Sequence, residues 1–137
     1  MTEKKSVLCP FCVEFPVNEV IAENARFKAK YDQYPVSAGH ALLIPKRHIS
    51  SFFELNEEEI LDFFELIRSV HKIILRKYSP QGFNIGINIG NAAGQTISHL
   101  HIHLIPRYTG DVDHPEGGVR NIVPNLVPYP KSTDIGM

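Results

Sequence analysis

Three histidines alternate with aliphatic residues in the segment 99–105, and they are His99, His101 and His103. On an extended strand they share one face, while the aliphatic residues share the other and are predicted to pack in the core. Three explanations are open: a polar sheet face with incidental histidines, one metal ion bound by all three, or histidines that serve different sites. Residues i and i+4 of a strand stand about 13 Å apart, whereas ligand nitrogens lie only ~2 Å from a zinc ion. The spacing favours different sites for the two ends of the segment.

Cys9 and Cys12 form a Cys-x-x-Cys pair near the N-terminus. A redox pair of the thioredoxin kind should follow a strand and open a helix, and no strand is predicted before Cys9. Two thiolates also make half of a tetrahedral zinc site, which they leave two ligands short. Two free thiols in an N-terminal loop are the third explanation.

Hydrophobic periodicity predicts the elements that must position these residues. A period of two predicts strands over residues 25–31, 83–89 and 99–105, and a short apolar run that Pro45 ends predicts another over 40–44. Spacings of three and four predict a helix from Asn56 to about Tyr78, with Asn56 and Glu59 as its capping box. The predicted core face of this helix comprises Ile60, Phe63, Phe64, Ile67, Val70 and Ile74. Strands around one long helix indicate an α+β fold with an antiparallel sheet of about five strands.

Composition limits the partners and the organisation of the chain. The 137 residues suit a single domain, 1–137, and 43% hydrophobic with 21% charged residues exclude a disordered chain. The net charge of −1 offers no basic excess for nucleic acid or an anionic membrane surface. No apolar run is long enough to span a membrane and no signal peptide is evident, so we expect a cytoplasmic protein. Prolines and glycines predict an irregular C-terminal tail from about residue 107.

The segment His99-Leu100-His101-Ile102-His103-Leu104-Ile105 resembles the signature of the histidine triad (HIT) superfamily, His-φ-His-φ-His-φ-φ with φ hydrophobic. Further segments match in family order: residues 35–40 with 44–48, Gly94-Gln95-Thr96 before the triad, and Pro106-Arg107 after it. The resemblance covers roughly residues 9 to 108. It implies a HIT-like fold, a nucleotide substrate and a homodimer. An apolar helix with more hydrophobic surface than one small sheet can cover also favours the dimer.

The resemblance implies roles for individual residues. His101 is the nucleophile that attacks the α-phosphorus of a nucleotide, and His103 donates a hydrogen bond to a non-bridging oxygen. A neutral imidazole suits this role near pH 7. His40 supports the nucleophile without touching the substrate. A buried histidine with its hydrogen bonds satisfied and no role in catalysis is an equally open explanation for this residue. The substrate-binding positions implied are Asp32, Asn88, Gly94, Gln95, Thr96 and Arg107.

Each substrate-binding position has a specific expected contact. Asp32 is expected to bind ribose hydroxyls, or else to be a turn residue before Pro35. Asn88, Gln95 and Thr96 are expected at phosphate or leaving-group oxygens, with a strand-end turn as the alternative for Asn88. Gly94 is expected to let backbone N–H groups approach the phosphate. Arg107 is expected on the phosphates distal to the attacked one, or else to be an ordinary surface residue.

The resemblance also completes the cysteine pair. HIT proteins that carry Cys-x-x-Cys add the histidine of Pro-Lys-x-His and the first triad histidine, which here are His48 and His99. The implied site is Cys9, Cys12, His48 and His99 around a structural zinc, because four protein ligands leave no open position.

Pro106-Arg107 after the triad resembles the dinucleoside polyphosphate-cleaving branch of the family, whereas the phosphoramidase branch has Gly-Gly-Arg there. The resemblance therefore implies a dinucleoside polyphosphate hydrolase that forms a covalent nucleotidyl-histidine intermediate. Alternatives are a nucleoside phosphoramidate hydrolase or nucleotidyltransferase of the same family, and a nucleotide-binding regulatory protein with little turnover. A purely structural zinc module would leave His101 and His103 without a role. The tail over 110–120 departs from both hydrolase patterns.

Overall fold

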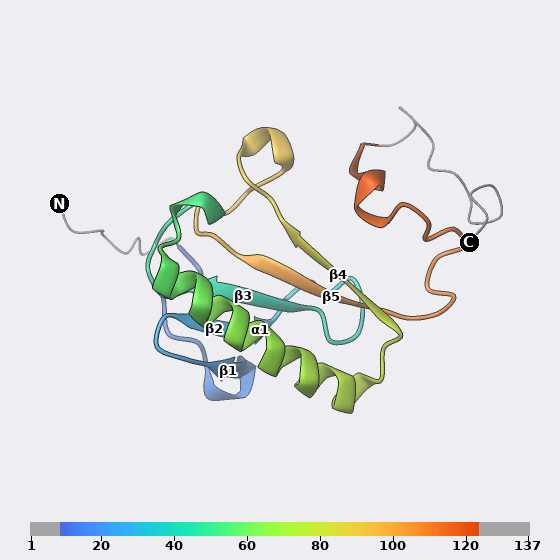
Figure 1. Cartoon of the computed structure of the whole chain (residues 1–137), viewed down its shortest axis with the longest axis horizontal. Helices are drawn as coiled ribbons and strands as arrows, with labels where there is room; N and C mark the ends of the chain where they lie inside the picture. The colour runs from blue at the N-terminus through green and yellow to red at the C-terminus, as the bar shows by residue number, and fades with distance from the viewer. Residues whose placement is uncertain (1–8, 124–137) are drawn as a thin grey trace.

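An antiparallel five-stranded sheet with one long helix across one face makes up the body of the protein (Figure 1). The computed structural model describes residues 9–123. The spatial order of the strands is β1-β2-β3-β5-β4. Their bounds are Val20–Glu23 (β1), Phe27–Tyr31 (β2), Ala41–Pro45 (β3), Gly82–Ile87 (β4) and Ile102–Arg107 (β5). Short 3-10 helices lie at Val17–Glu19 (η1), Phe52–Glu54 (η2), Asn91–Ala93 (η3) and Gly118–Ile122 (η4). The predicted α+β class with an antiparallel sheet is confirmed.

The long helix α1, Glu57–Tyr78, begins at the predicted capping box, in which Asn56 accepts from the N–H of Glu59 and the Glu59 side chain accepts from the N–H of Asn56. Two residues of the predicted core face are wrong, because Ile60 is 37% and Phe64 56% exposed. The helix packs on the sheet through the other four predicted residues, Phe63, Ile67, Val70 and Ile74, and through Leu66, which was not predicted.

The two faces of the sheet differ in character. The face under α1 holds the main core, formed by Phe27, Ala29, Ala41, Leu43, Leu100, Ile102 and Leu104 against the helix. The opposite face, called here the outer face, carries His103. In its central row, Lys30 of β2 pairs with Leu42 of β3, Leu42 pairs with His103 of β5, and His103 pairs with Gly86 of β4. Because paired residues point to the same side of a sheet, this row spans the outer face.

The strand bounds differ from prediction where side chains or loops take over backbone hydrogen bonds. Asn24 Oδ1 accepts from the N–H groups of Arg26 and Phe27, which delays the start of β2 to Phe27. The Leu100 N–H donates to Ile49 O outside the ladder, so β5 begins three residues later than predicted. The edge strand β1 was not predicted. Its first three residues are only partly buried, the fourth is exposed, and its register shifts at a bulge, which removes the alternation.

Candidate functional site

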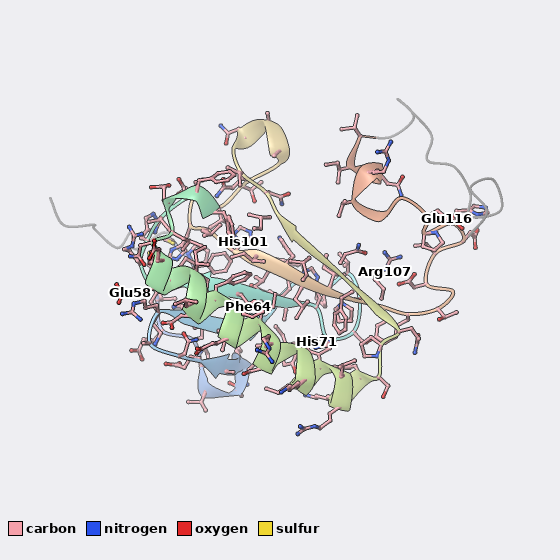
Figure 2. All side chains as sticks on the ribbon, in the orientation of Figure 1. Glu58, Phe64, His71, His101, Arg107 and Glu116 are labelled. Carbon is pink, nitrogen blue, oxygen red and sulfur yellow. The ribbon has the colours of Figure 1, made fainter. Side chains whose placement is uncertain are left out.

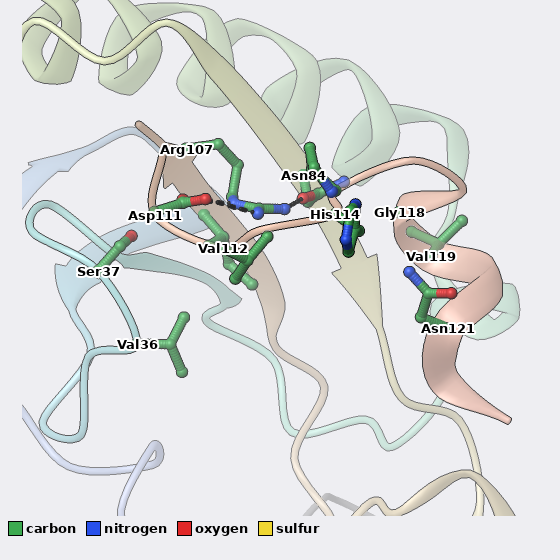
Figure 3. A pocket seen from close by; sticks show the side chains of 12 residues that line it. Val36, Ser37, Asn84, Arg107, Asp111, Val112, His114, Gly118, Val119 and Asn121 are labelled. Atoms are coloured by element: carbon green, nitrogen blue, oxygen red, sulfur yellow. Dashed lines mark hydrogen bonds and ion pairs between the residues drawn. The ribbon is translucent and has the colours of Figure 1, made fainter. Parts of the chain in front are cut away.

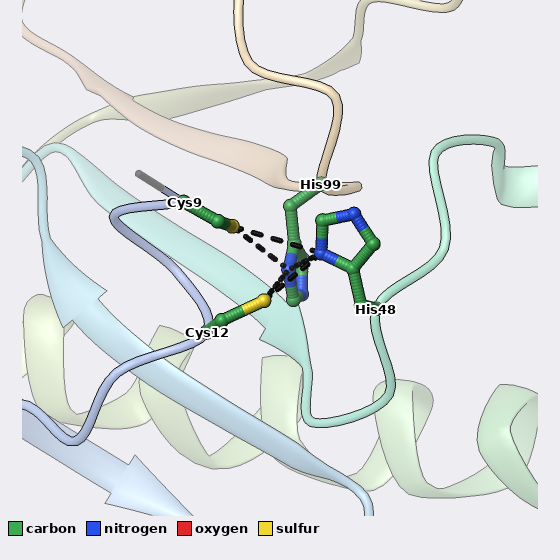
Figure 4. Close-up of side chains that lie close together, drawn as sticks. All are labelled: Cys9, Cys12, His48 and His99. Carbon is green, nitrogen blue, oxygen red and sulfur yellow. Dashed lines mark hydrogen bonds between the residues drawn. The ribbon is translucent and has the colours of Figure 1, made fainter. Parts of the chain in front are cut away.

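Two cysteines from the N-terminal turn meet two histidines from distant segments of the chain (Figure 4). The Sγ atoms of Cys9 and Cys12 lie 2.9–3.6 Å from the Nδ1 atoms of His48 and His99. The two Nδ1 atoms are 3.0 Å apart. Zinc bonds of ~2.3 Å to sulfur and ~2.0 Å to nitrogen place tetrahedral donors about 3.3–3.8 Å apart. The four residues implied by the resemblance therefore fit one tetrahedral ion, to which they would supply every ligand.

The tautomer of His99 also suits a metal. Its Nε2–H donates to the carbonyl oxygen of Pro45 at 2.8 Å, which leaves the Nδ1 lone pair facing the cysteines. Burial lowers the pKa of His99 to about 4, so the ring is neutral at pH 7. A backbone carbonyl that holds the second ring nitrogen is the usual outer support of a histidine ligand.

The loop that carries His48 is anchored to the start of α1. Arg47 donates from Nε and Nη2 to the two carboxylate oxygens of Glu59, at 3.0 and 2.7 Å. The Arg47 guanidinium, through these hydrogen bonds, lowers the pKa of the Glu59 carboxyl. Glu59 is nearly inaccessible, at 3% exposure, and it also completes the capping box. One ion pair thus fixes both the helix end and the loop before His48.

The cysteine turn brings an aromatic side chain to the triad. Phe11, between the two cysteines, packs with Leu42 and Ile44 on the outer face. Its ring centroid lies 5.1 Å from that of His101. An ion at the cysteines would therefore fix Phe11, and through it one wall around His101.

His101 presents a free ring nitrogen. Its Nδ1 lies 2.9 Å from the carbonyl oxygen of His99. A carbonyl oxygen only accepts, so Nδ1 carries the proton and the lone pair remains on Nε2. This is the tautomer that a nucleophilic imidazole requires.

A chain of hydrogen bonds fixes the tautomer of His103 as well. The Val36 N–H donates to His40 Nδ1 at 3.1 Å, so the His40 proton is on Nε2. That Nε2–H lies 2.9 Å from His103 Nδ1 and 3.3 Å from Asp32 Oδ2. His103 Nδ1 thus accepts, and its Nε2 keeps a proton to donate. Burial, with the nearby His101 and His40, lowers the pKa of His103 to about 4, which keeps this donor neutral.

Asp32, His40 and His103 also lie close enough to bind a cation. The bond from the Val36 N–H argues against it, because the proton it places on His40 Nε2 occupies the lone pair that a metal would need. The geometry identifies this cluster as a hydrogen-bonded support for His103.

His101 and His103 open onto a cavity of about 310 Å³ on the outer face. Figure 2 labels His101 beside β5 and Arg107 at its far end. The other residues that line the cavity are Pro10, Phe11, Lys30, Asp32, Gln33, Tyr34, Leu42 and Ile97. Apolar walls around a few polar groups are typical of a small-molecule site.

Most of these lining residues were missed from the sequence. Lys30 had a usable signal, because the alternation of β2 places it opposite Ala29 and Tyr31, on the polar face. Phe11 had none, since it reaches the cavity through the cysteine turn and not through a strand. Asp32 lines the cavity, and its Oδ1 accepts from the Tyr34 N–H at 2.8 Å within the turn before Pro35. Its predicted contact with ribose hydroxyls stays a prediction.

Gly94 and Gln95, which were expected to contact phosphate, form hydrogen bonds within their own loop before the triad. Gln95 accepts from the Gly90 N–H and donates to Ser50 O and Ile97 O, which uses both ends of its amide. The N–H groups of Gly94 and Gln95 donate within the loop, to Asn91 O and Gly90 O. Gly94 has φ +88°, which explains a glycine there by backbone conformation. In this structure these two residues shape the loop.

Asn88 and Thr96 are exposed and do not line the cavity. Asn88 follows β4 directly, one step beyond the last ladder pair of Ile87 with Ile102. This places its backbone beside His101. The predicted contacts of both residues with substrate stay predictions.

Arg107 lies on the outer face, and its guanidinium already has hydrogen-bond partners within the protein. It donates to both carboxylate oxygens of Asp111 at 2.8 and 2.9 Å, and to Asn84 Oδ1 at 2.7 Å. Its guanidinium, chiefly through hydrogen bonding, holds the pKa of Asp111 well below its usual range. Contact with distal phosphates stays a prediction, and it requires Arg107 to leave these partners.

A family model described as the HIT domain matches residues 16–110, well over half of the chain. The chain belongs to the HIT family. It is 35% identical over 120 residues to an uncharacterized HIT-like protein of Methanocaldococcus jannaschii, covering 84% of this chain and 92% of that one. It is 35% identical to an asymmetrical bis(5'-nucleosyl)-tetraphosphatase of Schizosaccharomyces pombe, over 72% of this chain and 54% of that protein. It is 39% identical to an adenosine 5'-monophosphoramidase of the same yeast, over 64% and 62%.

Solved structures of HIT proteins share the fold. A HIT family protein from Bacillus anthracis superposes with a TM-score of 0.70 at 33% identity, covering 78% of each chain. A zinc-bound histidine triad protein from Mycobacterium smegmatis gives a TM-score of 0.61 at 32% identity, covering 67% of each chain. Within residues 9–123, no helix is long and apolar enough to cross a membrane.

Proposed function

We propose that this HIT protein hydrolyses dinucleoside polyphosphates through a covalent intermediate on His101. The observation that carries the proposal is the pairing, in one cavity, of a free lone pair on His101 Nε2 with a proton on His103 Nε2. The tautomer of His101 follows from the hydrogen bond of its Nδ1–H to the backbone carbonyl of His99. The tautomer of His103 follows from the Val36 N–H, which fixes the proton of the neighbouring His40 on Nε2. The two groups can therefore meet one phosphate as a nucleophile and a hydrogen-bond donor.

The reaction would follow from these two atoms. His101 Nε2 attacks the α-phosphorus, the bond from phosphorus to the bridging oxygen breaks, and its electron pair leaves with the remaining polyphosphate. His103 Nε2–H donates to a non-bridging oxygen, where charge accumulates. Water then attacks the phosphorus, which releases a nucleoside monophosphate and restores the His101 lone pair.

Two relatives support different leaving groups. The tetraphosphatase supports a polyphosphate, and the phosphoramidase supports an amine as the second candidate. We favour the polyphosphate because the strand leaves the triad through Pro106-Arg107. Because Arg107 is held by Asp111, the preference for a polyphosphate leaving group also depends on a second cavity beyond His103.

The cysteine and histidine cluster is proposed to hold one structural zinc. The donor chemistry and spacing support zinc, as does the zinc-bound relative of known structure. A homodimer is proposed because Ile60, Leu61 and Phe64 form an exposed apolar face on α1, at 37%, 64% and 56% exposure. Neither a nucleic acid partner nor a membrane surface fits the net charge of −1, and a cytoplasmic location stays a prediction.

A substrate panel tests the proposal. Diadenosine tetraphosphate and adenosine 5'-phosphoramidate are given to the wild-type protein and to the His101→Ala variant, and products are separated by chromatography. We expect the wild type to release AMP from the dinucleotide with the larger kcat/KM, and the variant to lose several orders of magnitude. A larger kcat/KM for the phosphoramidate would select the second candidate. Undiminished turnover by the variant would refute the mechanism.

A further inference from the structure

A second cavity, of about 530 Å³, lies on the outer face beyond His103 (Figure 3). Its floor includes Ile105 and Arg107 of β5 and Asn84 of β4, and Asn84 pairs with Ile105 in the sheet. The tail after β5 supplies another wall, which includes Val112 and the start of η4. Figure 3 shows Val36 and Ser37 on the loop at one side and Val119 on η4 at the other. The cavity thus depends on the tail segment that departs from the family patterns in sequence.

Three contacts hold the walls of this cavity in place. Ser37 Oγ donates to Pro106 O at 2.7 Å, and the Tyr108 hydroxyl donates to Ala38 O at 2.6 Å. Arg107 pairs with Asp111 through two hydrogen bonds. These contacts connect the loop before His40, the end of β5 and the tail. The cavity is therefore largely formed before any ligand binds.

The chemistry of the lining selects an uncharged occupant. Asp111 matches the charge of Arg107, so the pair offers no net cation to a polyphosphate. Val36, Val112 and Val119 supply apolar surface. The remaining polar side chains are the amides of Asn84 and Asn121 and the imidazole of His114. Asn84 Oδ1 accepts from Arg107 and Asn121 Nδ2 donates to Glu116 O, so Asn84 Nδ2, Asn121 Oδ1 and the His114 ring are the groups that can meet the hydrogen-bonding edge of a heterocycle.

The two cavities flank His103 on opposite sides. The smaller one extends over β2 and β3 through Lys30 and Leu42, and the larger one extends over β4 and the end of β5. Gly86 pairs with His103 on the β4 side, and a Cβ at Gly86 would have nothing within 4 Å. The sheet is thus open beside His103. Ile105 and Arg107 lie about 7 and 13 Å from His103 along β5, so a substrate that uses both cavities needs a linker between its halves.

We propose that the larger cavity binds the departing half of the substrate, an uncharged heterocyclic group such as the second nucleoside of a dinucleoside polyphosphate. This inference rests on the proposed function. A polyphosphate bridge supplies the linker that the separation requires, whereas the small amine released from a phosphoramidate cannot reach the cavity. The phosphorus–oxygen bond breaks beside His103, and the departing polyphosphate carries its nucleoside away from this cavity.

Val119→Trp tests the inference by filling the cavity from η4, where Val119 is 58% exposed and tolerates a larger side chain. Val36→Trp fills it from the opposite loop, where Val36 is 72% exposed. The matched control is Val123→Trp, at a nearby position with 55% exposure that does not line the cavity. Circular dichroism checks folding. The measured quantities are kcat/KM for diadenosine tetraphosphate and the inhibition constant of AMP, which needs only the smaller cavity.

We expect both filling variants to lower kcat/KM for the dinucleotide by about tenfold and to leave the AMP inhibition constant within about twofold, with the control unchanged in both. Unchanged dinucleotide cleavage in folded filling variants would overturn the inference while the proposed function stands. An equal loss in AMP binding would also overturn it, because the tail would then act on the nucleophile's own cavity. A wild-type protein that cleaves no dinucleotide would remove the proposed function and this inference with it.

Discussion

Lowering the pH should destabilise the protein through His103, and the effect can be isolated with His103→Gln. Burial depresses the pKa of His103 from 6.5 to about 4 in the folded state. The unfolded chain therefore binds the proton more readily, so stability is full above pH 6.5 and is lost as the pH falls toward 4. Glutamine is uncharged at every pH used, so the variant lacks this contribution.

The two pKa values set the size of the effect. Between pH 7 and pH 4.5, proton binding to His103 alone should remove about 2 kcal/mol from the free energy of unfolding. The side chain is only 22% exposed, so solvent screens it little. Urea unfolding of wild type and variant at both pH values gives the difference, in which the titration of the other groups cancels to first order. Equal losses in the two proteins would refute a neutral, buried His103, and with it the donor role of its Nε2–H.

Three further perturbations test other parts of the structure. Removing the metal with a chelator, or replacing Cys12 by serine, should lower the melting temperature measured by calorimetry, because an ion that binds only the folded state stabilises it; an unchanged melting temperature would exclude a structural ion. Glu59→Gln should cost about 1–3 kcal/mol in urea unfolding, since the buried Glu59 carboxylate loses its charge toward the half-exposed Arg47 and the helix cap weakens; a change within error would show that the pair contributes nothing. Replacing Leu61 and Phe64 by serine should shift sedimentation from dimer to monomer at micromolar concentration, and a monomeric wild type would reject the interface.

Local sequence patterns predicted the start of an element well where nearby side chains satisfy its backbone hydrogen bonds. Asn56 and Glu59 predicted the start of α1, because a capping box satisfies specific N–H groups at that point. Strand ends were less predictable. The Leu100 N–H bonds to Ile49 O, a contact between distant segments that no local pattern can reveal.

The candidate site was predictable where the strand period controls it. Alternation placed His99, His101 and His103 on one polar face, and the length of the strand between its two ends predicted that His99 and His103 serve different sites. The spacing of Cys9 and Cys12 predicted only half of a metal site, because the fold alone brings His48 and His99 to the two cysteines. The pairing of Arg107 with Asp111 and the commitment of Gln95 to its own loop depend on tertiary packing, so the sequence suggested free ligands at both positions.

Trapping the intermediate tests the role of His101 most directly. The wild-type protein is mixed rapidly with diadenosine tetraphosphate, quenched in alkali that preserves phosphorus–nitrogen bonds, and examined by intact mass and peptide mapping. The tautomers predict one adenylyl group per active site, on His101, and none on the His101→Ala variant. An adenylyl group on His103, or hydrolysis with no labelled protein under single-turnover conditions, would contradict the assignment of His101 as the nucleophile.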